Sequence, residues 1–342
     1  MNIGKISESV LKHSILHQIH TKNDEVLEGA GIGEDCALFA FSKEEAVAVS
    51  VREAAVATKA ALDFADTEKV SMAHLIQKCA NNLAARGAKP IAAMIVLLLP
   101  QTAEPEDVKK LMEEAEETCA GLSMQIAGGQ TRVSKAVTAP LAMVSGYGTV
   151  SGQNYAALKA VKPGQAIVLS KWAGLEGTAI LARKYKDRLG ARYPAYLAEE
   201  AKGFDKYLSV IPEAATAMKS GVCAMHDASE GGIFASLWEL AEGAGIGLDI
   251  DLRKIPLRQE TVEICECCGV NPYELLSGGC LIMVTENGER LIEALEAEGI
   301  PAAMVGRTTD SNDRILHNGE EVRYMNRPQT DALYKEPVES GT

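Results

Sequence analysis

Two hydrophobic periods alternate along this 342-residue chain, and they predict two kinds of element. Short runs of branched apolar residues are typical of strands, whereas apolar residues three and four positions apart are typical of helices. The longest apolar run, IAAMIVLLLP at 91–100, is rich in branched residues and ends in proline, so it predicts a buried strand. Strands are predicted at 46–51, 91–99, 124–129, 140–150, 166–170, 280–284 and 302–306, with a hairpin near 314–325.

Helical periodicity fills most of the stretches between these strands. Pro105, with acidic residues in or beside the first turn, and Gly121 bound a predicted helix at 105–120. Two glycines at 231–232 open a strongly amphipathic helix that runs to about residue 244. Further helices are predicted over the first 19 residues and at 69–86, 177–189, up to 220, 259–268 and 287–298.

This order of elements predicts the fold class and the domains. Helices and strands alternate throughout with many antiparallel connections, so the class is α+β (mixed α/β). Glycine, asparagine and Pro-Gly interrupt the pattern at 151–163, which predicts a boundary between domains at 1–155 and 156–330. Residues 331–342 are predicted to form a disordered tail.

Charge and composition narrow the class of partner. The 47 acidic and 34 basic side chains give a formal charge of −13, which argues against a nucleic-acid surface. No apolar run reaches the length of about 18 residues that a membrane-spanning helix needs. Eight cysteines without an export signal are typical of reduced thiols in a cytoplasmic protein.

Four loops combine glycine with acidic or amide side chains. Neither the P-loop pattern nor a complete G-x-G-x-x-G is present. Glycines let backbone N–H groups approach a phosphate, and nearby carboxylates can hold Mg²⁺. The loops are GIGEDCALF (31–39), NNLAARGAKP (81–90), AGGQTRV (127–133) and HDASEGG (226–232).

Each loop also has a purely structural interpretation. Asp227 and Glu230 are three residues apart at a helix start, the spacing of a capping box that needs no ligand. GIGED alone is more often a tight turn, and His226 at a strand end is slightly more often structural than catalytic. CECC at 265–268 resembles a metal motif, but Cys267 points away from the other two, so buried helical thiols are the favoured interpretation.

Taken together, six segments in order resemble the aminoimidazole ribonucleotide synthetase superfamily, most closely its HypE-like, synthetase-related branch. They are the four loops above with GLEGTAILA (174–182) and NPYELLSGGCLIMV (271–284), and the resemblance runs from about Gly4 to about Arg307. It implies a two-domain PurM-like fold, with an N-terminal domain that pairs with a second copy into a β-barrel and a C-terminal α+β sandwich. It also implies ATP in a cleft that HDASEGG lines, with Asp227 capping a helix whose start faces the ligand.

The resemblance assigns site residues by position. It implies His226 and Asp227 as catalytic residues and Asp35 and Asp227 as metal ligands. It places the nucleotide on two glycine loops, two positions of the N-terminal domain and the HDASEGG loop. These residues are Gly31, Gly33, Glu34, Asp35, Arg52, Asn82, Gly128, Gly129, Gln130, Glu230 and Gly231.

The chain departs from its relatives at the acids that would hold Mg²⁺. Val51 and Arg52 stand where Thr-Asp is usual, Asn82 replaces an aspartate, and Gln130 stands at a variable position. Neutral amides and a guanidinium disfavour a nearby cation, so the Mg²⁺ site is expected to be weakened, whereas Arg52 could meet a phosphate. HypE, the hydrogenase maturation factor of this branch, carries a C-terminal cysteine on which it forms cyanide. The last cysteine of this chain is Cys280, so that reaction is not expected here.

Two functions remain open at this point. The first is a homodimeric enzyme that uses ATP to activate an amide-type oxygen or to transfer a phosphoryl group to an unidentified small substrate or carrier. The alternative is a catalytically degenerate nucleotide-binding or regulatory dimer. Besides a second copy of the chain and a nucleotide, a metalloenzyme-maturation protein is a possible partner.

Overall fold

The computed structural model describes residues 5, 7–42, 44–57, 69–151 and 154–334. These form two compact units, Asp24–Gly29 with Asp35–Tyr155 (the first unit) and Met1–Asn23 with Ala30–Glu34 and Ala156–Thr342 (the second unit). The chain passes from one unit to the other after Tyr155, close to the predicted boundary, while the N-terminal segment groups with the second unit.

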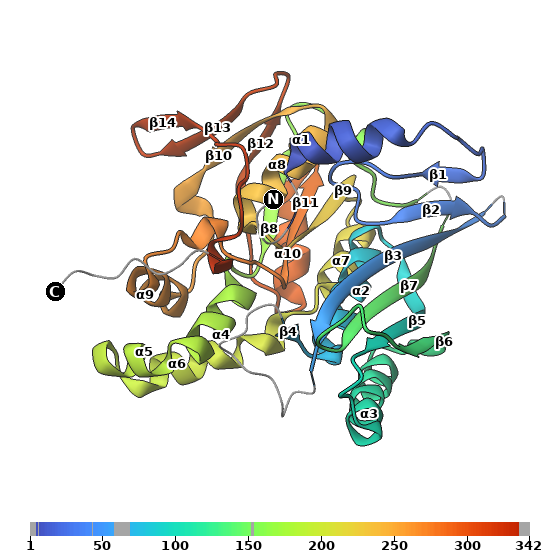
Figure 1. The fold of residues 1–342 in the computed structure, drawn as a ribbon. Coiled ribbons are helices and arrows are strands. Elements are labelled where there is room, and N and C mark those ends of the chain that lie inside the picture. Colours follow the sequence, from blue (N-terminus) through green and yellow to red (C-terminus); the bar gives the residue numbers. More distant parts are fainter. Residues whose placement is uncertain (1–4, 6, 43, 58–68, 152–153, 335–342) are drawn as a thin grey trace. The chain divides into compact units, whose positions relative to one another are not determined.

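The first unit is a seven-stranded sheet with two helices on one face (Figure 1). The strand order is β1-β2-β3-β7-β5-β6, with β4 beside β3. Neighbours are antiparallel except β5/β6 and β3/β4, and α3 provides the crossover that a parallel β5–β6 pair requires. The strands are β1 (Val26–Glu28), β2 (Ala37–Ala40), β3 (Glu45–Val56), β4 (Lys69–Val70), β5 (Lys89–Leu99), β6 (Gln125–Val133) and β7 (Leu141–Ser151).

Helix α2 (Met72–Ala85) packs against β3 and β7, and α3 (Pro105–Gly121) packs against α2. The helix predicted from residue 69 starts at Met72 instead, because the Ser71 side chain accepts a hydrogen bond from the His74 N–H and so caps it. Residues along β3 and β7 alternate between buried and less buried, so every second side chain faces α2.

The second unit is a seven-stranded sheet in the order β14-β13-β10-β12-β8-β11-β9, antiparallel except for β10/β13. Helix α8 shares one apolar core with Ile167, Leu169 and Ile282, and α10 lies against Val168 on the other face. The strands are β8 (Ala166–Ser170), β9 (Ala224–Ala228), β10 (Gly247–Asp251), β11 (Cys280–Thr285), β12 (Ala302–Thr309), β13 (Arg314–Asn318) and β14 (Glu321–Tyr324).

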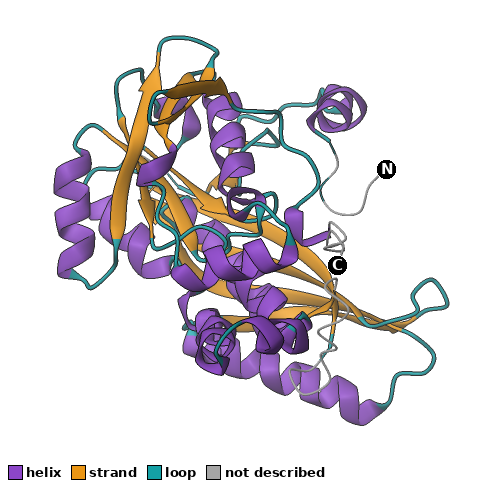
Figure 2. Cartoon of the chain, turned by 90° about the vertical axis from the view of Figure 1, so that its left-hand side faces the viewer, coloured by secondary structure: helices purple, strands orange, loops and turns teal. Residues whose placement is uncertain are grey.

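Helices α4, α5, α6 and α9 of this unit form a second, helical core, whereas α7 lies against α10 and β11 (Figure 2 shows all helices in purple). The helix predicted at 177–189 is divided at Tyr185, whose backbone leaves the helical region. The helices are α4 (Leu175–Lys184), α5 (Lys186–Arg192), α6 (Ala195–Lys202), α7 (Ile211–Lys219), α8 (Gly232–Ala244), α9 (Gln259–Cys268) and α10 (Gly288–Ala297).

Both ends of the chain differ from expectation. The N-terminal helix is split into α1 (Glu8–Val10), a π-helical turn (Leu11–Ile15) and a 3₁₀ turn (Leu16–Gln18). The prediction of disorder from residue 331 is wrong for the first four residues, because Asp331, Ala332 and Leu333 are buried in and beside a 3₁₀ turn. The rest of the predicted tail, 335–342, lies outside the described residues.

Candidate functional site

The predicted site residues are divided between the two units. Asp35, Arg52, Asn82 and residues 128–130 belong to the first unit, and residues 31–34 and 226–231 belong to the second. The two predicted metal ligands, Asp35 and Asp227, therefore lie in different units.

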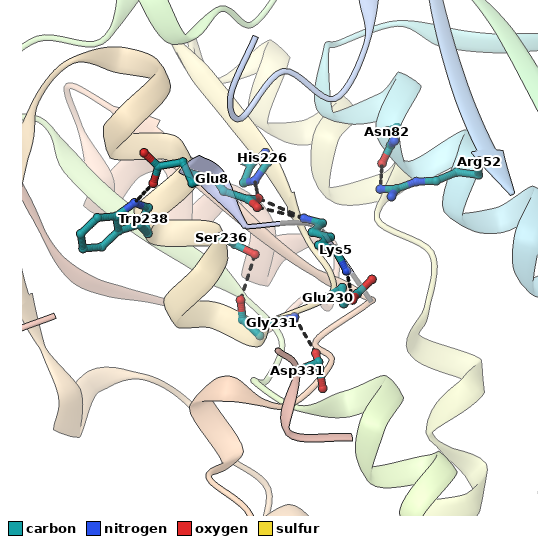
Figure 3. Close-up of polar contacts among 12 residues, drawn as sticks. Lys5, Glu8, Arg52, Asn82, His226, Glu230, Gly231, Ser236, Trp238 and Asp331 are labelled. Atoms are coloured by element: carbon teal, nitrogen blue, oxygen red, sulfur yellow. Dashed lines mark hydrogen bonds and ion pairs between the residues drawn. The ribbon is translucent and has the colours of Figure 1, made fainter. Parts of the chain in front are cut away.

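Arg52 and Asn82 meet directly in the first unit (Figure 3). Arg52 projects from β3 toward α2, and its Nη2 donates to the Asn82 Oδ1 at 2.8 Å. The Asn82 Nδ2 donates to the Ser50 Oγ at 2.9 Å and to the Asp35 carbonyl at 3.3 Å. Asn82 is only 4% exposed, and both the oxygen and the nitrogen of its side-chain amide have hydrogen-bond partners within the first unit.

This arrangement does not fit a divalent cation. The Asn82 oxygen that would replace the usual aspartate is bound to a guanidinium, which repels Mg²⁺ at close range. Within the described ranges, no cluster of three or more His, Cys, Asp or Glu residues could hold a metal. The arrangement does fit an anion, since the buried Arg52 Nε has no hydrogen-bond acceptor among the described residues.

Gln130 does not join this pair within one chain. Strands β7 and β5 separate β3 from β6, a distance of about 14 Å at about 4.8 Å per strand. Gln130 also pairs with Val96, on the face opposite α2. The neighbouring Gly129 has a structural reason, because a Cβ there would lie 1.8 Å from the Ile95 carbonyl oxygen.

The GIGED loop places its glycines against the second unit. Gly33 has φ +73°, and a Cβ at this position would meet the Glu239 carbonyl oxygen of α8 at 2.6 Å. Gly33 is therefore required for close packing of the loop on α8, whatever ligand the loop also binds. Gly31 lies two residues earlier, next to the Glu34 side chain.

His226 and Asp227 occupy successive positions of β9 and so project to opposite faces of the sheet. His226 is 3% exposed and faces α8, where its Nε2 lies 3.1 Å from the Glu239 Oε2. Lys5 Nζ lies 3.0 Å from the other oxygen of Glu239. Burial acts to raise the pKa of Glu239, but Lys5 and His226 outweigh it and hold that pKa at about 2.

The start of α8 is not a capping box, so that prediction is wrong. The N-cap residue is Gly231, whose backbone is in the left-handed region, and no side chain among the described residues caps the helix. Asp227 lies four residues earlier, inside β9, and therefore does not cap the helix. The Gly231 N–H donates instead to Asp331 Oδ2 at 2.5 Å.

Asp331 is a residue that sequence reasoning missed. Its carboxylate also accepts the Leu276 N–H at 3.2 Å and the Leu333 N–H at 2.8 Å. It is 1% exposed, and burial raises its pKa to about 6 although these backbone donors act to lower it. The carboxylate thus joins two glycine-rich loops to the C-terminal segment, and the local sequence gives no signal for that contact.

The GLEGT and SGG segments pack on each other. The Gly174 N–H donates to the Ser277 Oγ at 2.8 Å, and the Gly177 N–H donates to the Leu276 carbonyl at 2.9 Å. A Cβ at Gly278 would fall 2.0 Å from Oε2 of the buried Glu176. Close packing against the Glu176 side chain explains Gly278.

The cysteines behave as buried thiols. All eight are free, and Cys265, Cys267 and Cys268 are buried on α9. Burial raises the pKa of Cys265 to about 12 and that of Cys268 to about 11, so the structural interpretation of CECC is confirmed, although Cys267 is buried with the others. Cys280 is fully buried as well.

Two sequence-family models match the chain in order. Residues 33–150 match the N-terminal domain of AIR synthase related proteins, and residues 162–317 match their C-terminal domain. The part of the chain that the structure describes contains no helix long and apolar enough to cross a membrane.

Curated relatives align over about two thirds of their own length. A hydrogenase expression/formation protein of Methanocaldococcus jannaschii is 29% identical over 240 residues, which is 69% of this chain and 69% of that protein. The carbamoyl dehydratase HypE of Rhodobacter capsulatus is 28% identical over 233 residues, 66% of each chain.

Solved structures show the same fold. HypE in a HypE–HypF complex superposes with a TM-score of 0.70 at 20% identity, covering 87% of this chain and 94% of that one. HypE in complex with ATP gives 0.68 at 16% identity, covering 96% and 97%. With both domain models matched in order over a fold of this kind, the chain belongs to the family of AIR synthase related proteins, in its HypE-like branch.

Proposed function

We propose that this chain is a HypE-like ATP-binding protein that activates an amide-type oxygen, or transfers a phosphoryl group, on an unidentified small substrate or carrier. The observation that carries the proposal is the Arg52 guanidinium, fixed by Asn82 at 2.8 Å with its buried Nε lacking an acceptor among the described residues. An N–H donor in that state favours an anionic ligand, and a triphosphate is the anion found with a solved relative.

Arg52 would neutralise phosphate charge where relatives are expected to use metal held by acids. A guanidinium supplies fixed positive charge at the phosphates, which is most of what a protein contributes to phosphoryl transfer. His226 lies with its Nε2 3.1 Å from the ionised Glu239, and in this proposal its imidazole would hold or move a proton. In this proposal Asp35 and residues 128–130 are further ligand residues of the first unit. Asp227, Glu230, Gly231 and the 31–34 loop are ligand residues of the second unit.

Calorimetric titration of ATP tests the proposal, first in EDTA and then with Mg²⁺. Wild type should bind in EDTA, and Arg52→Ala should bind about tenfold or more weakly, since a hydrogen bond to a charged group contributes about 1.5–3 kcal/mol. Arg253→Ala, which removes an exposed arginine of the second unit, is the matched control and should bind as wild type does. Equal binding by Arg52→Ala and wild type would contradict the role of Arg52.

The metal site can be rebuilt as a second test. Arg52→Asp combined with Asn82→Asp replaces a cation and an amide by two carboxylates, so Mg²⁺ should strengthen ATP binding in this variant by about tenfold or more. In wild type, the same addition should change affinity by less than about threefold. Binding by wild type that is lost in EDTA would show that acids elsewhere hold the metal.

The alternative function is a nucleotide-binding regulatory dimer. It is favoured by the two ends of the Asn82 amide, which are already hydrogen-bonded to Arg52 and Ser50. ATP binding without turnover of any acceptor would select this alternative. Both versions include a homodimer formed through the uncovered face of the first sheet and a cytoplasmic location, supported by the eight free thiols. A maturation protein is the proposed partner, since a relative has been solved in a HypE–HypF complex.

A further inference from the structure

The described N-terminal residues, Lys5 and Ser7–Gln18, lie along the outer side of α8 within the second unit. Their polar contacts with the helix fall on Trp238, Glu239 and Glu242. The Trp238 Nε1 donates to the Glu8 Oε2 at 2.7 Å, and Lys12 pairs with Glu242. We call these N-terminal residues the strap.

The first residue of the strap contacts Glu239, the carboxylate beside the predicted catalytic histidine (Figure 3). The Lys5 N–H donates to the Glu230 Oε1 at 2.7 Å, and its Nζ lies 3.0 and 3.2 Å from the two oxygens of Glu239. Glu239 in turn contacts the His226 Nε2. The strap therefore contacts a carboxylate that joins His226 to α8.

The strap is held by charge and hydrogen bonds rather than by an apolar core. Among its described residues none is fully buried, and the core that α8 shares with the sheet includes no residue before Leu158. Lys5 and Lys12 are each about two-fifths exposed in their ion pairs. Exposed ion pairs are weak and are screened by salt, so the strap can leave without opening the core.

We propose that the strap is a charge-held cover over His226 and Glu239, which has to open before a ligand can reach the His226 imidazole. This inference rests on the proposed role of His226, but covering can be measured without nucleotide. An anionic ligand is suited to open the strap, because it competes with Glu239 for the Lys5 ammonium and with Glu230 for the Lys5 N–H.

Carbethoxylation of histidines by diethyl pyrocarbonate, mapped on peptides by mass spectrometry at pH 8, tests the proposal on the full chain. Lys12→Gln loosens the strap without touching Glu239, so the rate at His226 should rise by about fivefold or more. In 1 M NaCl, where the screening length is about 3 Å, wild type should show a similar rise. Lys5→Gln should do the same, because it removes the ion pair between the strap and Glu239.

Lys254→Gln is the matched control, because it removes one exposed ion pair, with Asp251, away from the strap. Its His226 rate should equal that of wild type, and the rate at His317 should be the same in every variant. Acrylamide quenching of Trp238 in a Trp172→Phe background gives a second readout and should increase in Lys12→Gln and Glu8→Gln. Unchanged His226 labelling and unchanged Trp238 quenching in all strap variants would overturn the proposal, whatever the outcome of ATP titration.

Discussion

At the scale of single residues, Asp331 should impose a pH dependence on stability. Its pKa is about 6 in the folded chain against about 3.9 when unfolded, so the folded state holds the proton more tightly. The stability that Asp331 contributes is complete below about pH 4 and falls by about 3 kcal/mol as pH rises through 6. In urea unfolding, the stability of wild type relative to Asp331→Asn should therefore decline between pH 4 and 7.

The exposed Asp310 provides the comparison for that measurement. Asp310→Asn should leave the slope of stability against pH unchanged. A wild-type slope that Asp331→Asn leaves intact would mean that Asp331 is ionised throughout the range and that its three N–H donors, rather than burial, determine its state.

The chemistry of the candidate site could be predicted where it depends on residue type. It could not be predicted where it depends on a contact between residues far apart in the sequence. The replacement of acids at 52 and 82 is visible in the sequence, and the two side chains do meet. Asp331 lies 100 residues from Gly231 with no pattern between them, so its contact could not be predicted. Likewise, an amphipathic period places Glu239 on α8 but does not reveal that His226 lies opposite.

At the scale of elements, the glycines at the two ends of α8 allow the effect of backbone strain to be measured apart from that of steric crowding. Gly232 and Gly245 have φ of +69° and +68°, so alanine is strained equally at both. A Cβ at Gly232 would meet the Tyr273 carbonyl oxygen at 2.5 Å, whereas none of the described atoms lies within 4 Å at Gly245. Gly245→Ala should cost about 1–2 kcal/mol of unfolding free energy, and Gly232→Ala at least about 3 kcal/mol.

Urea titration of the two variants at neutral pH measures this difference. Because both substitutions change glycine to alanine at one helix, unfolded-state entropy affects them alike and cancels in the comparison. Equal losses would show that the 273–275 loop moves aside freely, so that Gly232 is not what fastens it to α8.

Element types follow from hydrophobic periods, whereas element ends depend on local hydrogen bonds. Branched runs correctly predicted β5, β7 and β11, and the Pro105 start of α3 agrees with the structure. The glycine pair correctly predicted the start of α8, but its cap was misassigned because Asp227 and Glu230 have the spacing of a capping box, yet the strand continues through Ala228. A strand of three residues such as β1 is too short for a period to appear.

At the scale of the whole molecule, the order of six loop segments predicted the fold better than any single motif did. Each loop has a local structural reason, such as the close approaches at Gly33, Gly129 and Gly278, and such reasons belong to the fold itself. Because the same approaches are needed wherever these elements pack, their order identifies the family, whereas the proposed function depends on the few side chains that differ, Arg52 and Asn82 above all.

The first sheet carries apolar side chains on the face opposite α2, and this face bears the prediction of a homodimer. Val51 is 51% exposed, and Met94 and Met143 are exposed on the neighbouring strands β5 and β7. A patch of this kind is typical of an interface, so Met94→Lys with Met143→Lys should weaken self-association by about 100-fold, or about 2.7 kcal/mol. Sedimentation equilibrium should give a dimer for wild type and for Val322→Lys, which charges an exposed apolar residue of β14; a wild-type monomer would leave this face without its proposed partner.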